Sequence, residues 1–109
     1  MTIEKLKRLL SYLKGTLALR LTLSVDGLNV IKWWTDSSFA LHDDMKSHSG
    51  GFGTLGKGAF YATSTNQKLN TTTSTESEVV AVAEILPQAL WTVSFLKHQG
   101  YGAVNVLFN

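Results

Sequence analysis

The 109-residue chain contains no cysteine and a single proline, and its charged residues are few. The absence of cysteine excludes disulfide bonds and thiolate metal sites, and it is compatible with a reducing compartment. The sequence has no charged leader before an apolar core, and we expect no segment that spans a membrane. The cytoplasm or the nucleus is therefore the expected location.

The composition is that of one small globular domain. Hydrophobic residues make up 44% of the chain, which is enough for a core and argues against a disordered tail. The formal net charge is +2, and the only compact basic run is formed by Lys5, Lys7 and Arg8. Such a charge leans mildly towards anionic partners and is far from the dense basic surface of a dedicated nucleic-acid binder.

The first third of the chain predicts a helix followed by two strands. Apolar residues recur at helical spacing over residues 2–14, and Gly15 marks the end of this helix. We expect this amphipathic helix to need a partner surface. Residues 17–25 alternate strictly between apolar and polar side chains, as in a half-buried strand. The Asp26-Gly27 pair that follows is typical of a hairpin turning back onto residues 28–36.

The rest of the chain predicts a mixed α/β sheet. A glycine-rich hairpin is expected from strands over residues 49–55 and 59–65. Apolar residues at helical spacing predict a long helix from 75 to 98, and residues 103–108 predict a last strand. Because a helical crossover requires a parallel return, we expect this last strand beside residues 30–36.

Acidic residues at the ends of elements are the candidates for chemistry. The apolar, β-branched strand over residues 30–36 ends in Asp36, at the rim of the predicted sheet. Glu76 and Glu78 begin the long helix, whose first turn can meet that rim. Converging carboxylates repel unless a cation lies between them, and hard oxygen ligands favour Mg²⁺ or Mn²⁺. Purely structural interpretations stay open: Asp36 can begin a turn, and Glu78 can form a capping box with Thr75.

Other polar clusters are weaker candidates. His42, Asp43, Asp44 and His48 lie close together in sequence, but their spacing matches no metal-ligand pattern, and we expect a solvated loop. The three tryptophans are expected in the core or in partner contacts, not as platforms for stacked bases.

Five blocks of sequence stand in order along nearly the whole chain. They are Tyr12-Leu-Lys-Gly-Thr16, Trp34-Thr-Asp-Ser-Ser-Phe-Ala40, Asp44-Met-Lys-Ser-His-Ser-Gly50, Ser64-Thr-Asn-Gln-Lys68 and Ser74-Thr-Glu-Ser-Glu78, the last followed by Leu90-Trp91. Taken together, the blocks resemble the ribonuclease H region of copia-type retrotransposon polyproteins. The resemblance implies a partial ribonuclease H-like α/β domain over residues 17–109. It also implies that residues 1–16 are the tail of the connection region of a reverse transcriptase.

The family's activity is cleavage of RNA paired with DNA, at clustered acids that hold two Mg²⁺ ions. By resemblance, Asp36 matches the first acid. The family pattern for the second acid is Glu, apolar, any residue, Ala, which Glu78-Val79-Val80-Ala81 fits. Glu78 is therefore preferred, and Glu76 is a neighbouring candidate ligand. The implied partners are an RNA–DNA hybrid and the reverse transcriptase portion of the same polyprotein, in a cytoplasmic virus-like particle or the nucleus and without a membrane.

The chain also departs from the family pattern. Ser38 stands where relatives often carry another acid, and the family's third acid would follow directly after Asn109. We therefore expect this chain alone to be inactive, with one sheet face partly uncovered and a tendency to self-associate.

Two alternatives stay open. The first is a catalytically inactive remnant that serves only as a folded nucleic-acid- or protein-binding scaffold, and an in-frame Asp followed by a helix beyond Asn109 would favour the enzyme instead. The second, an integrase-like nuclease, is disfavoured because the Thr-rich approach to Glu76 fits ribonuclease H better.

Overall fold

A computed structural model of the chain describes residues 2–27, 29–39 and 46–109. Its elements are, in order, α1 (Ile3–Gly15), β1 (Val30–Ser38), β2 (His48–Thr54), β3 (Ala59–Asn66), α2 (Ser74–His98) and β4 (Val104–Phe108). The strands form one sheet in the order β3-β2-β1-β4. The pairs β1–β2 and β2–β3 are antiparallel, whereas β1 and β4 run parallel, as predicted. The chain therefore has an α/β fold with a mixed sheet.

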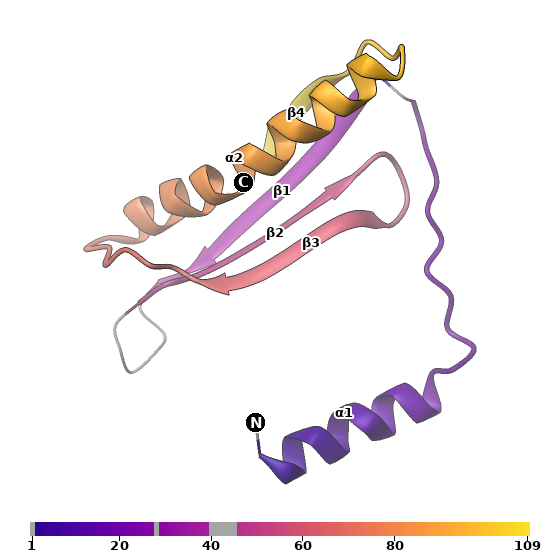
Figure 1. The fold of residues 1–109 in the computed structure, drawn as a ribbon. Helices are drawn as coiled ribbons and strands as arrows, with labels where there is room; N and C mark the ends of the chain where they lie inside the picture. Colours follow the sequence, from indigo (N-terminus) through magenta and orange to yellow (C-terminus); the bar gives the residue numbers. More distant parts are fainter. Residues whose placement is uncertain (1, 28, 40–45) are drawn as a thin grey trace.

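Helix α2 crosses one face of the sheet, whereas α1 lies apart from it (Figure 1). α2 contacts β1, β2 and β4, and α1 contacts none of the described helices and strands. The predicted loop residues His42, Asp43 and Asp44 lie outside the described residues.

The core lies between β1 and α2. Because successive side chains of a strand point to opposite faces, Ile31 and Trp33 are buried beneath α2, while Trp34 lies on the other face and is 41% exposed. Trp33 is completely buried, and its Nε1 donates a hydrogen bond to Asn105 Oδ1 at 2.9 Å. This bond links β1 to β4 and satisfies the only polar atom of the ring.

Two glycines of β2 set how closely the core packs. A Cβ atom on Gly53 would lie 2.6 Å from the Trp33 ring, and one on Gly51 would lie 2.5 Å from Ile85 Cδ1. Gly50 differs, because a Cβ there meets nothing within 4 Å. Gly51 therefore lets α2 pack close to the sheet, and Gly53 leaves room for the Trp33 ring. The sequence had predicted only a hairpin role for these glycines.

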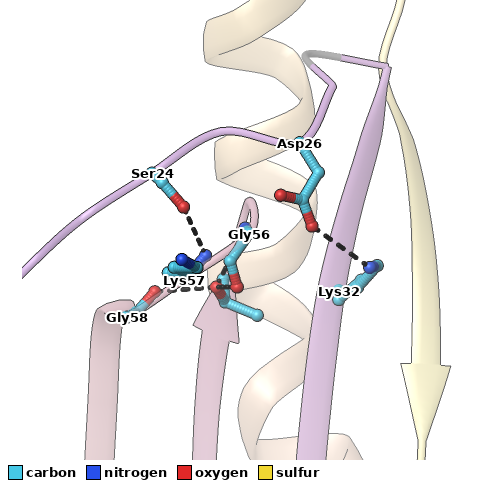
Figure 2. Close-up of polar contacts among 7 residues, drawn as sticks. Ser24, Asp26, Lys32, Gly56, Lys57 and Gly58 are labelled. Carbon is cyan, nitrogen blue, oxygen red and sulfur yellow. Dashed lines mark hydrogen bonds and ion pairs between the residues drawn. The ribbon is translucent and has the colours of Figure 1, made fainter.

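The predicted strand over residues 17–25 is wrong. Strand β1 is already paired along both edges, with β2 and with β4, so no edge of β1 is left for a hairpin partner. The segment instead approaches the turn between β2 and β3 (Figure 2). There Ser24 N donates to Lys57 O at 3.0 Å, Asp26 N donates to Leu55 O at 2.9 Å, and Lys57 N donates to Ser24 Oγ at 2.8 Å.

The expectation that no segment is long and apolar enough to span a membrane is wrong, because α2 meets both criteria. α2 has 25 residues and reaches a mean hydropathy of 1.7 over an 18-residue window. Core helices of soluble proteins meet the same criterion, and α2 packs six buried residues against the rest of the fold. The helix continues through Pro87 as one element.

The glycine packing predicts different outcomes for two alanine substitutions in the same strand. We expect Gly53→Ala to lower the free energy of unfolding by about 1–3 kcal/mol, because the added methyl group overpacks the Trp33 ring. Gly50→Ala is the control and should change it by less than about 0.5 kcal/mol. Denaturant unfolding followed by tryptophan fluorescence measures both values, and equal effects would contradict the packing described.

Candidate functional site

Asp36 lies within β1, close to its C-terminal end and opposite Gly50 of β2. The strand continues to Ser38, so the interpretation of Asp36 as the first residue of a turn is wrong. Its side chain is exposed, and its Oδ1 accepts a hydrogen bond from Ser37 N at 2.8 Å. It lines a shallow hollow together with Trp34, Phe52 and Asn109 among others. A carboxylate held by a strand and open to solvent is well placed to bind a cation.

Glu76 is the acid that takes part in capping at the first turn of α2. The helix begins at Ser74, and the side chain of its N-cap, Thr73, accepts a hydrogen bond from Glu76 N at 3.1 Å. Glu76 Oε2 in turn accepts hydrogen bonds from Thr72 N at 2.7 Å and from Thr72 Oγ1 at 2.9 Å. The predicted capping box between Thr75 and Glu78 is therefore wrong, because the helix begins before Thr75. The reciprocal bonds are those of a capping box displaced towards the N-terminus.

These bonds also change the acidity of Glu76. The backbone N–H of Thr72, followed by its hydroxyl, lowers the pKa of the Glu76 carboxyl below its ordinary value. The carboxylate is stabilised because hydrogen bonds to the charged form favour it. An oxygen that already accepts two hydrogen bonds is a poorer metal ligand, so Glu76 is better suited to capping than to the site.

Glu78 is not used in capping. Its side chain is exposed, and within the described part of the chain it has no hydrogen bond or ion pair. At about 3.6 residues per turn, Glu78 falls on the same stripe of α2 as Ile85 and Leu96, which are buried. Glu78 therefore continues the buried side of the helix at its N-terminal end, where its side chain is solvent-accessible.

A buried polar cluster fixes this end of the helix to the sheet. Ser37 Oγ and Ser77 Oγ lie 2.7 Å apart and share a hydrogen bond between β1 and α2. The side chain of Gln67, which follows β3, donates to Ser49 Oγ at 2.9 Å and to Ser77 O at 2.8 Å. Gln67 and Ser77 are fully buried, so removing either side chain would leave buried polar atoms of the other without a hydrogen-bond partner.

The cluster joins the backbone of the two acids, while the alternation of β1 turns the Asp36 side chain, like that of Trp34, to the face away from α2. Ser37 follows Asp36 directly, and Ser77 precedes Glu78, so the serine–serine bond joins the backbone segments that carry both carboxylates. No sequence pattern predicted this cluster. A signal was present, since Ser37 and Ser77 both fall within the blocks that carry the family resemblance, but neither serine has a periodicity that predicts burial.

The end of β1 and the start of α2 offer few ligands for a metal ion. Over residues 2–27, 29–39 and 46–109, no three His, Cys, Asp or Glu side chains gather into a metal-binding group. His48 lines a hollow with Asp36, but its ring nitrogens lie 3.0 Å from Asn66 Oδ1 and 2.6 Å from Ser64 Oγ. Asp36 and Glu78 are the two candidate acids whose side chains are exposed and lie outside the capping bonds.

The capping bonds predict a pH dependence that belongs to Glu76. Because its folded-state pKa is lowered, Glu76 stabilises the fold above its unfolded-state pKa, and this contribution is lost as the pH falls through the folded-state value. Glu76→Gln should therefore be less stable than the wild type at neutral pH, and the difference should shrink as the solution is acidified.

Thermal unfolding, followed from pH 7 down to pH values well below the ordinary pKa of glutamate, measures this difference. Glu78→Gln is the matched control, because its side chain lies outside the capping bonds, and it should keep the wild-type pH profile. A Glu76→Gln difference that stays constant with pH would contradict the capping assignment.

Three comparisons with known proteins found no relative of the chain. No family model matches the chain, and neither the curated proteins nor the solved structures include a match.

Proposed function

We propose that the chain is the ribonuclease H domain of a copia-type retrotransposon, acting in the intact enzyme on RNA paired with DNA. Residues 1–16 would then be the tail of the reverse transcriptase connection region, and the following residues would form the domain. The strand order β3-β2-β1-β4, with α2 as the crossover, supports a ribonuclease H-like fold, because the resemblance implies three antiparallel strands, a helix and then a parallel strand.

The meeting of three element ends carries the proposal. The first turn of α2 is bonded to the end of β1 through Ser37 and Ser77. Strand β4 runs parallel to β1 and pairs Phe108 with Trp34, so Asn109 and Asp36 line the same hollow. The family resemblance assigns an acid to each of these three places. In this chain two of them carry an acid, Asp36 and Glu78.

Asp36 and Glu78 are the residues that would hold a divalent cation of the Mg²⁺ or Mn²⁺ type. Asp36 and Glu78 supply hard oxygen ligands, and Mg²⁺ is commonly bound through one or two carboxylates while it keeps several waters. Bound metal ions would supply activation of a water and stabilisation of the leaving oxygen of the RNA strand. Asp36 would hold its ligand oxygen rigidly from the strand, and the buried Gln67 would keep the helix start in position.

The hybrid would be recognised by its shape and its RNA strand. An A-like duplex presents 2′-hydroxyl groups in a wide, shallow minor groove, and these groups distinguish it from DNA alone. Exposed polar side chains beside Asp36, such as Ser38, are available for such contacts.

A non-catalytic scaffold is the second candidate, favoured by the small number of ligands. Two carboxylates are too few to fix two metal ions, and the described residues add no third ligand beside them. On this alternative the domain would bind nucleic acid or protein without cleaving anything.

We expect the 109-residue chain alone to leave a labelled RNA–DNA hybrid uncleaved in Mg²⁺ or Mn²⁺, because it lacks ligands for a second metal ion. A version extended at Asn109 by an aspartate and a following helix should cleave it. In the extended version, Asp36→Asn and Glu78→Gln should each reduce the rate by more than about 100-fold, since even indirect partners of metal ligands can cost 10–100-fold.

Glu76→Gln is the matched control in the extended version, because Glu76 caps the helix, and its rate should change only a few-fold. Cleavage by the short chain that disappears with Asp36→Asn would contradict the expected inactivity while supporting the site. An extended version that binds the hybrid without cleaving it would favour the scaffold.

A further inference from the structure

The chain exposes far more surface than a compact protein of its size. A compact monomer of 12.0 kDa exposes about 6,000 Å², whereas this chain exposes 8050 Å². Its radius of gyration is 16.8 Å, against about 13 Å for a compact chain of this length. Each molecule thus carries an excess of about 2,000 Å². Two chains that buried this excess against each other would form an interface in the range of obligate homodimers, about 2,000–5,000 Å².

One part of the excess is the leucine face of α1, formed by Ile3, Leu6, Leu9, Leu10 and Leu13. These side chains are between 43% and 73% exposed, and α1 contacts none of the described helices and strands. A single helix of this length is marginal in water unless its apolar side packs against a partner. The leucine face therefore needs a covering surface, as the sequence predicted.

A second part is the open sheet face, formed by Val30, Trp34, Phe52, Val104 and Val106 on the side away from α2. These side chains are between 36% and 59% exposed, which confirms the expectation of a partly uncovered sheet face. The Trp34 ring stacks on Phe52 and on Phe108, with centroids 6.2 and 4.3 Å apart. The face spans three neighbouring strands, and α1 at about 20 Å long fits across it.

The connection between these surfaces points to exchange between two copies. Ser24 and Asp26 are bonded to the β2–β3 turn, which anchors one end of the connection. Residues 16–25 contain neither glycine nor proline; a turn at 16–18, in which Leu19 N donates to Thr16 O at 3.0 Å, follows α1, and residues 19–25 run extended to this anchor. Seven extended residues reach about 24 Å. For α1 to return to its own sheet, the chain would have to reverse between the turn at 16–18 and the anchor at Ser24, a run without glycine or proline.

Charge also favours contact between α1 of one copy and residues 16–109 of another. Residues 3–15 contain four basic residues and one acidic residue, a formal charge of +3. Residues 16–109 contain six basic and seven acidic residues, a formal charge of −1. Lys32 and Asp36 both lie on the side of the open sheet face; Lys32 Nζ lies 3.9 Å from Asp26 Oδ2, which leaves the Asp36 carboxylate to attract a basic helix.

We propose that the chain forms a two-fold symmetric dimer in which α1 of each copy packs its leucine face on the open sheet face of the other. The exchange buries both apolar surfaces at once and leaves each connection extended. Such an interface is isologous, as closed homodimers require. Trp34 and Phe52 belong both to the open sheet face and to the hollow beside Asp36, so α1 of the second copy would also cover part of that hollow.

The oligomeric state in solution tests the role of α1. Sedimentation equilibrium or light scattering should give a dimer for the wild type, and Leu10→Glu should weaken the dimer at least tenfold. Because α1 contacts none of the described helices and strands, this change leaves the sheet intact. Ser11→Glu adds the same charge outside the leucine face and should leave the dimer within about threefold of the wild type. A monomeric wild type, or equal effects of the two changes, would overturn the proposal.

A crosslinking experiment tests the surface that α1 covers. The chain has no cysteine, so a mixture of the single variants Leu10→Cys and Val106→Cys can join only through the introduced thiols. Under mild oxidation the mixture should form a disulfide-linked species containing one copy of each variant. Ser11→Cys mixed with Val106→Cys is the control and should form much less. Efficient linking of Leu10→Cys to Leu90→Cys, on the outer side of α2, instead of to Val106→Cys would overturn the assignment of the open sheet face.

Discussion

The packing of α2 across β1 is the interaction on which the rest of the structure depends. It buries Trp33 completely, and it is possible only because Gly51 and Gly53 leave room for Ile85 and for the indole ring. The same packing fixes the helix start at the end of β1, where Ser37 and Ser77 share a hydrogen bond. The proposed site is thus a consequence of the core: whatever shifts α2 also shifts Glu78 relative to Asp36.

The two helices were predictable from their helical periodicity, and so was the parallel return of β4. The segment over residues 17–25 has the clearest alternation in the chain and yet is not a strand. Alternation predicts an extended backbone with one apolar side, but pairing needs a free neighbouring edge, and β2 and β4 occupy both edges of β1. The availability of an edge is a property of the whole sheet that no local pattern contains.

The candidate site was predictable only in part, for a similar reason. Asp36 was singled out because it stands at the end of a strand with a clear pattern, and Glu78 was preferred to Glu76 by the family resemblance; both stay predictions. The exact helix start was not predictable, since several Thr and Ser residues in a row can each act as the N-cap, and Thr73 takes that role. Gln67 could not be identified either, because its burial depends on contacts with two elements distant in sequence.

The central claim is that the carboxylates of Asp36 and Glu78 can share one cation. The most direct measurement is the broadening of backbone amide resonances by Mn²⁺ added in small amounts to the isotope-labelled chain. We predict that the amides near the end of β1 and those in the first turn of α2 broaden together at the lowest Mn²⁺ concentrations. Asp36→Asn should abolish the broadening at both places. Broadening confined to one of the two, or unchanged by Asp36→Asn, would contradict the shared site.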